Sequence, residues 1–196
     1  MLYNDVCNDN LSRLGFGTMR LPLKEDGKTI DEIEFQKMVD YAINNGINYF
    51  DTAYPYHDGH SELALGRALK KYPRDKFYLA SKFPGFDISF IENVEDIFEK
   101  QLEKCQVDYF DFYHIHNVHE LNIEQYLDPK YRIYDYLTKM KAEGKIKKDY
   151  EGCLSVPRIY GMVPRETKVR VKAKLEDGAE VRIKATDELA RTLLHE

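Results

Sequence analysis

Residues 50–62, FDTAYPYHDGHSE, decide how the rest of this chain is interpreted. The apolar beginning of the stretch is typical of the end of a buried strand, and the pair Ser61-Glu62 is typical of the start of a helix. The loop between them carries an acid at Asp51, a phenol at Tyr56 and two imidazoles. A lysine and another histidine end apolar runs elsewhere in the same way, which predicts one shared site.

The chain on both sides of this stretch alternates apolar strand-like runs with amphipathic helical ones. The expected strands are Arg13–Met19, Ile47–Thr52, Phe77–Lys82 and Tyr109–His116. The expected helices are Asp31–Asn45, Ser61–Lys71, Glu92–Gln106 and Tyr131–Glu143. Four β–α units in series indicate a parallel sheet, either a barrel or an open doubly wound sheet. The tyrosines between Ile123 and Tyr136 indicate helix packing rather than a surface for stacking ligands.

The position of the polar side chains favours a barrel. Asp51, Lys82 and His116 each stand at the end of a different expected strand, and barrel enzymes assemble their sites at this end of the sheet. The lone pair Gly15 and Gly17 is a weak signal for a phosphate-binding loop. The predicted fold class is therefore α/β, a partial (β/α) TIM-type barrel of about four β–α units.

The composition changes abruptly near Lys148–Asp149. Residues 149–196 hold nine basic and nine acidic residues but only two of the 25 Phe and Tyr residues of the chain. Two alternating runs, 168–175 and 181–185, flank Asp177-Gly178, a pair typical of a hairpin turn. A helical pattern starts near Thr186. We therefore expect a second, small α+β segment made of a β-hairpin and a helix.

Composition also limits the partners and the compartment. A net charge of −5 gives no reason to expect binding to nucleic acid or to a membrane. The three cysteines are scattered and odd in number, which argues against a disulfide framework and for a reducing cytoplasm. We find no signal segment and no apolar run of about 18 residues. The expectation is a cytoplasmic protein.

The motifs FGTMRLP, FDTAYPYHDGHSELALGRAL, YLASKFP and YFDFYHIHN resemble the aldo/keto reductase family in order and spacing, over residues 11–147. The resemblance implies NADPH-dependent reduction of small aldehydes and ketones to alcohols. It also implies a catalytic tetrad of Asp51, Tyr56, Lys82 and His116. His116 takes the histidine position, rather than His114, because it stands directly before Asn117 at the strand end.

The chemistry explains these residue types. Carbonyl reduction needs a hydride, which the resemblance assigns to NADPH, and a proton, which it assigns to Tyr56. A lysine beside a phenol favours the phenolate, so Lys82 would activate Tyr56, and Asp51 would hold Lys82 in place. His116 would orient the substrate oxygen by a hydrogen bond. The residues that match the nicotinamide end of the cofactor site are Gly17, Thr18, Met19 and Asp51.

The second half of the family's barrel is not expected in this chain. After the run MKAEGKIKK, residues 140–148, the family continues with a fifth strand and with most of the cofactor pocket, and here we expect neither. The reductase activity would then be impaired. A half barrel also leaves two open strand edges, through which a homodimer would complete eight strands.

The run EGCLSVP, residues 151–157, and the hairpin and helix after it resemble the C-terminal part of peptide deformylase. The resemblance implies Fe2+ or Zn2+ held by Cys153 and His195, with Glu196 as the general base in hydrolysis of N-formylmethionine peptides. The next histidine ligand would follow His195 by four residues, past Glu196, so a segment without metal is the favoured expectation.

The predicted domains are a half barrel, residues 1–148, and a deformylase-like fragment, residues 149–196. Three interpretations stay open: a carbonyl reductase, a metal-dependent deformylase, and a chimeric fragment without catalysis.

Overall fold

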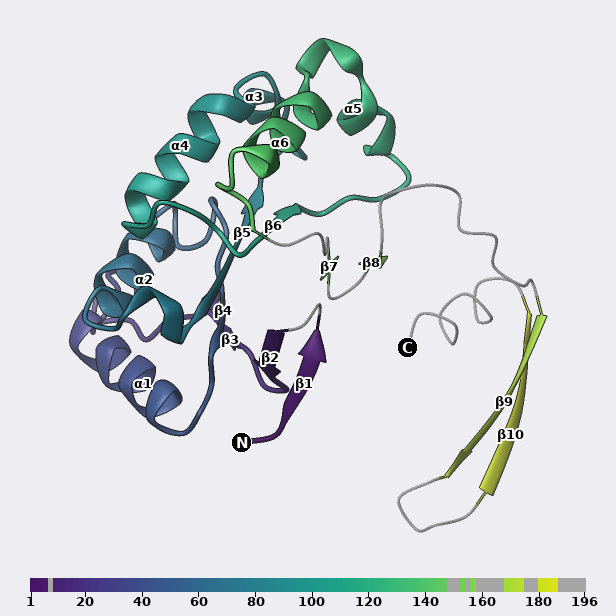
Figure 1. Ribbon diagram of the computed structural model, residues 1–196, viewed down its shortest axis with the longest axis horizontal. Helices are drawn as coiled ribbons and strands as arrows, with labels where there is room; N and C mark the ends of the chain where they lie inside the picture. Colours follow the sequence, from purple (N-terminus) through teal and green to yellow (C-terminus); the bar gives the residue numbers. More distant parts are fainter. Residues whose placement is uncertain (7–8, 148–151, 154–155, 158–167, 175–179, 187–196) are drawn as a thin grey trace. The chain divides into compact units, whose positions relative to one another are not determined.

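A computed structural model of the chain describes residues 1–6, 9–147, 152–153, 156–157, 168–174 and 180–186 (Figure 1). The chain divides into an N-terminal unit, Met1–Glu151, and a C-terminal unit, Gly152–Glu196. The boundary predicted near Lys148–Asp149 falls on residues outside the described ranges.

The N-terminal unit is built on a four-stranded parallel sheet in the order β3-β4-β5-β6. The strands are β3 (Phe16–Gly17), β4 (Tyr49–Asp51), β5 (Tyr78–Phe83) and β6 (Phe112–Ile115). The main helices are α1 (Glu32–Asn44), α2 (Ser61–Leu69), α4 (Val94–Cys105) and α6 (Ile133–Ala142). Figure 1 shows these helices along one side of the sheet. Sequential parallel strands joined by helices confirm the predicted partial barrel.

Several helix boundaries differ from the expected ones. The helix expected at Glu92–Gln106 is preceded by a separate short helix, α3 (Ile88–Ile91), because Asp87 caps it through the amide of Ser89. The region before α6 holds two more short elements, α5 (Ile123–Leu127) and the 3-10 helix η2 (Pro129–Tyr131). Another 3-10 helix, η1 (Arg74–Lys76), precedes β5. The first strand is shorter than expected.

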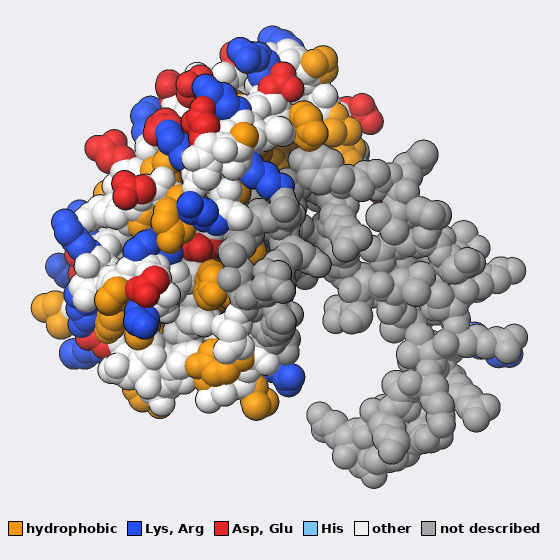
Figure 2. Space-filling view, viewed as in Figure 1, with side chains coloured by type: hydrophobic (Ala, Val, Ile, Leu, Met, Phe, Trp, Pro, Cys, Tyr) orange, Lys and Arg blue, Asp and Glu red, His pale blue; other side chains and the backbone are white. Residues whose placement is uncertain are grey.

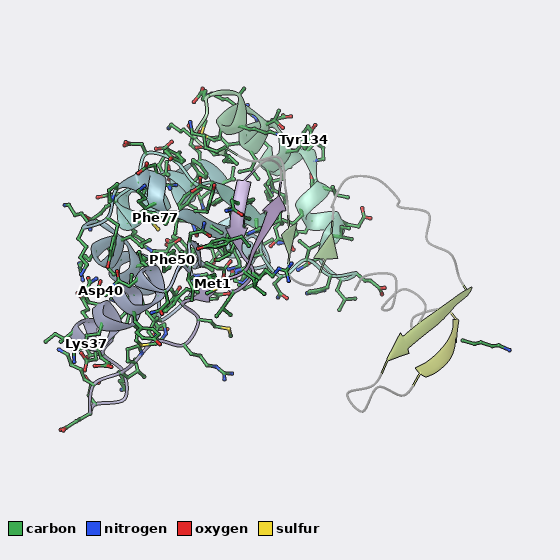
Figure 3. The ribbon with its side chains drawn as sticks, turned by 60° about the horizontal axis from the view of Figure 1, so that its bottom comes forward. Met1, Lys37, Asp40, Phe50, Phe77 and Tyr134 are labelled. Atoms are coloured by element: carbon green, nitrogen blue, oxygen red, sulfur yellow. The ribbon has the colours of Figure 1, made fainter. Side chains whose placement is uncertain are left out.

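The core lies between the sheet and the helices. Its largest fully buried side chains include Phe35, Phe50, Phe83, Phe98 and Phe110. Burying each of them stabilises the fold by about 1.5–3 kcal/mol. Figure 3 labels Phe50 and Phe77, whose rings meet edge to face at 6.3 Å. Figure 2 shows acidic and basic side chains interspersed over the outer surface of this unit.

A hairpin without a sequence signal of its own precedes the sheet. Its strands are β1 (Tyr3–Val6) and β2 (Asp9–Ser12), paired antiparallel. Leu11 packs against Ala80 and Phe112, whose side chains point away from the helix-covered face because side chains alternate along a strand. The hairpin is fixed to the sheet where Asn48 Oδ1 accepts a 2.8 Å hydrogen bond from the amide of Ser12.

In the described part of this unit no strand follows α6, although one residue pairs with the edge of the sheet. Ile146 forms a parallel β-bridge with Phe110, just before β6. The amide of Phe110 donates to Lys145 O at 3.0 Å, and the amide of Lys147 donates to Phe110 O at 3.0 Å. After α6 the chain therefore returns to the edge of the sheet in the direction that a fifth barrel strand would take.

The C-terminal unit is described only in part. The antiparallel pair of β9 (Lys168–Lys174) and β10 (Glu180–Thr186) confirms the predicted hairpin. A second, two-residue pair joins β7 (Gly152–Cys153) to β8 (Val156–Pro157). The helix expected from about Thr186 onward lies outside the described residues. In the ranges that the structure describes, no helix is long and apolar enough to cross a membrane.

Candidate active site

The parallel sheet brings the four residues of the predicted tetrad to one edge. Asp51 is the last residue of β4, Lys82 lies near the end of β5, and His116 directly follows β6. Tyr56 lies in the loop between β4 and α2. Because neighbouring parallel strands end at the same edge of a sheet, side chains that are distant in sequence converge there.

Lys82 is the centre of the arrangement. Its Nζ lies 2.5 Å from Asp51 Oδ1 and donates a second hydrogen bond of 2.7 Å to Thr52 O. The two side chains are mostly buried, 16% exposed for Lys82 and 20% for Asp51. Burial raises the pKa of Asp51, and the ammonium group of Lys82 opposes that rise. The pair is therefore a largely desolvated ion pair in which each charge depends on the other.

Tyr56 and His116 complete the group. The Lys82 ammonium lies 5.0 Å from the centre of the Tyr56 ring. The rings of Tyr56 and His116 meet edge to face, with centroids 5.8 Å apart. The ring of Tyr56 thus lies close to both the cation of Lys82 and the imidazole of His116.

The two histidines of β6 and its end have different surroundings. His114 is buried, lies opposite Lys82 in the β5–β6 register, and faces Tyr49 Oη at 3.5 Å through Nε2. His116 lies against the rings of Tyr56 and Phe86 instead. Burial, followed by the charge of Lys82, lowers the pKa of each histidine to about 4. Both rings are therefore neutral at pH 7. Of the two histidines, His116 is the one whose ring contacts Tyr56.

The residues predicted for the cofactor lie beside Asp51. Gly17 pairs with Asp51 in the β3–β4 register, and an added Cβ there would meet nothing within 4 Å. Met19 is 62% exposed. Thr18 is fully buried, and its hydroxyl donates to Asp51 O at 3.1 Å. The space beside Gly17 is thus open and Met19 is exposed, whereas the Thr18 hydroxyl is already committed to the protein.

A cluster of buried hydroxyls behind Asp51 was not anticipated. Ser61 Oγ donates to Thr18 Oγ1 at 2.7 Å and lies 3.1 Å from Thr52 Oγ1. All three side chains are fully buried. They tie the start of α2 to the ends of β3 and β4. The sequence carries no signal for this cluster, because a serine before an apolar helical run indicates a helix start and says nothing about a buried hydroxyl contact.

A second buried network lies behind Lys82. Glu62 on α2 accepts from Ser81 Oγ at 2.7 Å and from Gln101 Nε2 at 2.6 Å. Gln101 Nε2 also lies 3.1 Å from Lys82 O, and Tyr113 donates to Gln101 Oε1. Glu62 and Gln101 are polar residues within the apolar stripes of their helices. This interruption is the sequence pattern from which a buried polar network could have been predicted.

The predicted metal residues cannot be placed together. Cys153 lies in β7, and its side chain is not among those described. His195 and Glu196 fall outside the described residues. In the described part of the chain no group of three or more His, Cys, Asp or Glu residues could hold a metal ion. The metal site stays a prediction.

Comparison with known families identifies both parts of the chain. Residues 13–148 match the model of the aldo/keto reductase family, and residues 101–196 match the model of polypeptide deformylase. The two matches overlap over residues 101–148. The chain belongs to the aldo/keto reductase family, and its C-terminal part is similar to peptide deformylase, as the motifs indicated.

Individual proteins agree with this assignment. A probable aldo-keto reductase 1 of Glycine max is 35% identical over 153 residues, 70% of this chain and 40% of that protein. A peptide deformylase of Thermomicrobium roseum is 59% identical over 46 residues, 24% of this chain and 26% of that protein. The chain thus spans less than half the length of these relatives.

Solved structures agree as well. An aldo-keto reductase of Bacillus halodurans in its holo form has a TM-score of 0.54 at 29% identity, over 71% of this chain and 45% of that one. An aldo-keto reductase of Klebsiella pneumoniae in complex with NADPH has a TM-score of 0.54 over 76% of this chain and 49% of that one. At 24% identity, the second similarity supports the fold alone.

Proposed function

We propose that this chain is an oxidoreductase that uses NADPH to reduce small aldehydes and ketones to alcohols. The observation that carries the proposal is the position of the Lys82 ammonium, 2.5 Å from the Asp51 carboxylate and 5.0 Å from the centre of the Tyr56 ring. A buried cation held by a carboxylate beside a phenol favours proton transfer from that phenol.

Each residue has a role in this reaction. When bound, the nicotinamide cofactor supplies the hydride. Tyr56 Oη gives the proton to the oxygen of the substrate as negative charge develops there, and Lys82 stabilises the phenolate that is left. Asp51 keeps Lys82 charged and in place. The neutral ring of His116 donates a hydrogen bond that orients the carbonyl group toward Tyr56.

The cofactor would lie over Gly17, with Thr18 and Met19 at the end of β3 and Asp51 beside them. The space at Gly17 and the exposure of Met19 support a flat ring at this position. Membership of the aldo/keto reductase family supports a nicotinamide cofactor. The preference for NADPH over NADH, the small carbonyl substrate and a cytoplasmic location are parts of the same proposal.

We include a homodimer in the proposal. The sheet ends at β3 on one side, and on the other side a single bridge at Ile146 continues it. Unpaired strand edges are sites of association, so a second copy of the chain could extend the sheet. Light scattering at working concentration tests this part, and a monomer would remove the homodimer without affecting the tetrad.

The test of the reductase is a calorimetric titration of the purified, folded protein with NADPH, repeated with NADH. Saturable binding near one cofactor per chain or per dimer, with turnover of a small aldehyde, is the expected result. Tyr56→Phe should keep cofactor binding and lose turnover. Tyr41→Phe is the matched control, because Tyr41 is exposed on α1. Absence of heat from protein that circular dichroism shows to be folded would overturn the proposal.

A second candidate function is metal-dependent hydrolysis of N-formyl groups. The match of residues 101–196 to polypeptide deformylase is the observation that favours it. Cys153 and His195 would hold Fe2+ or Zn2+, with Glu196 as general base. Metal analysis after purification without chelators decides this candidate: about one metal ion per chain, lost in Cys153→Ser, would support it, and less than about a tenth would reject it.

A further inference from the structure

Tyr126 connects α5 to the end of β6. Its hydroxyl donates a 2.6 Å hydrogen bond to His116 O. The side chain is 7% exposed, and its ring packs edge to face against Phe83. Gly85 permits this approach, because a Cβ at Gly85 would lie 2.5 Å from the Tyr126 ring. A phenylalanine could fill the same space, so packing alone does not explain the hydroxyl.

Two neighbouring side chains reach toward the same edge. Asn122 Nδ2 donates to Asn117 O at 2.9 Å, and Gln125 Nε2 donates to Gly85 O at 3.0 Å. Asn122 Oδ1 also accepts from the amide of His119 at 2.8 Å. Asn122, Gln125 and Tyr126, here called the α5 clamp, thus bind backbone carbonyls just beyond the ends of β5 and β6.

The orientation of the His116 side chain depends on its backbone and on ring packing. Its amide makes the last bond to the neighbouring strand, to Phe83 O at 3.0 Å. The next residue, Asn117, has a φ of 54°, in the left-handed region, which the short polar side chain of asparagine tolerates better than most. His116 Nδ1 is buried and has no hydrogen-bond partner among the described residues. The ring orientation therefore depends on the backbone and on packing against Tyr56 and Phe86.

We propose that the α5 clamp, through Tyr126 above all, is a positioning device that sets the orientation of the His116 ring against Tyr56. The inference rests on the proposed reductase function for its catalytic consequence, but the geometry it describes is measurable without turnover. Tyr126 is a positioning residue in this scheme, because it acts on the carbonyl of His116 and not on the substrate.

The experiment compares Tyr126→Phe with Tyr136→Phe. Both tyrosines are similarly buried, but the hydroxyl of Tyr136 faces Glu99 at 3.5 Å, away from His116. The readout is the NMR spectrum of histidine-labelled protein, with the His116 ring signals assigned from His116→Gln. Tyr126→Phe should shift the His116 ring signals, because the ring changes its contacts with the rings of Tyr56 and Phe86. Tyr136→Phe should leave them unchanged.

Unchanged His116 signals in folded Tyr126→Phe would overturn the proposal. If Tyr126→Phe does not fold, Asn122→Ala decides in its place, because it removes the bond to Asn117 O next to His116. Where the wild type reduces carbonyls, Tyr126→Phe should lower kcat about tenfold with little change in the KM for NADPH. A wild type without turnover would reject the proposed function, whereas the NMR comparison would still decide the positioning role.

Discussion

Asp51 and Lys82 form an ion pair in which the two side chains are 20% and 16% exposed. Removing one partner of such a pair leaves a buried charge without compensation, which costs about 3–5 kcal/mol. Lys82→Met should therefore lower the free energy of unfolding by about that amount. Adding Asp51→Asn to this variant should restore part of the lost free energy of unfolding, because the unpaired carboxylate of Asp51 is then removed. Urea unfolding of the two variants measures the difference.

The control for this cycle is an exposed pair. In the ion pair of Lys37 and Glu34 the two side chains are 68% and 51% exposed. Exposed ion pairs contribute little to the free energy of unfolding. Lys37→Met should thus change stability little. If Lys82→Met were as mild as Lys37→Met, the pair would be less desolvated than the structure indicates.

The neutral histidines predict a loss of stability in mild acid. His114 has a folded-state pKa of about 4 against an ordinary 6.5, owing first to burial. The unfolded chain therefore binds the proton more readily, so the stability contributed by neutral His114 is present above pH 6.5 and is lost as the pH falls toward 4. Between pH 7 and pH 5 the loss should be about 2 kcal/mol.

Denaturant unfolding at several pH values tests this prediction. His114→Gln should unfold with a smaller pH dependence than the wild type between pH 7 and pH 5. His60→Gln, at an exposed position, should retain the wild-type dependence. Equal slopes for the wild type and both variants would mean that His114 is not the titrating group.

The partial barrel and the strand-end positions of Asp51, Lys82 and His116 could be predicted from local patterns, whereas Tyr56 entered the predicted tetrad through the resemblance to aldo/keto reductases. Strand and helix patterns alternate, and parallel pairing brings the ends of β4, β5 and β6 together whatever the loops do. The hairpin β1–β2 carries no comparable signal: it is held by distant partners, such as Asn48 for Ser12. Ile146 is one apolar residue among lysines, and only its isolated bridge to Phe110 places it at the edge of the sheet.

The buried polar networks could be predicted only in part. A polar residue within an apolar stripe, as at Glu62 or Gln101, can be read from helix periodicity. That these two side chains hydrogen-bond to each other depends on how α2 and α4 pack. The role of Tyr126 was likewise hidden, because a tyrosine in a helix pattern indicates packing and says nothing of its hydroxyl.

The carboxyl group of Glu62 gives the opposite pH dependence from that of the histidines. Its pKa is raised, chiefly by burial, while hydrogen bonds from Ser81 and Gln101 and the charge of Lys104 oppose the rise. A raised carboxyl pKa means that the folded state holds the proton more tightly, so this contribution is largest at low pH and falls as the pH rises through the folded pKa. Glu62→Gln, which cannot ionise, should gain stability relative to the wild type as the pH rises.

Thermal or urea unfolding from pH 4, below the ordinary glutamate pKa of 4.5, to pH 8 measures that trend. The control is Glu92→Gln, because Glu92 is 59% exposed in its pair with Lys130. The variant at Glu92 should follow the wild type throughout. A constant difference between Glu62→Gln and the wild type across this range would contradict the raised pKa of Glu62.

The contact between α2 and α4 depends on Gly66. A Cβ at Gly66 would lie 2.6 Å from Lys104 O and 2.7 Å from the carbonyl group of Cys105, and these are backbone atoms that cannot rotate away. Gly66→Ala should therefore push the helices apart and destabilise the protein by about 1–3 kcal/mol. Gly17→Ala is the matched control for stability, because an added Cβ there meets nothing within 4 Å.

Gly66→Ala should also affect the tetrad, through the buried hydrogen bonds of Glu62 and Gln101. Separating α2 from α4 draws Glu62 away from Gln101, which bonds to Lys82 O. Gly66→Ala should thus lower turnover as well as the melting temperature, although Gly66 touches neither the cofactor nor the substrate. A variant that melts earlier but reduces carbonyls at the wild-type rate would show that the tetrad is held by the sheet and not by the helices behind it.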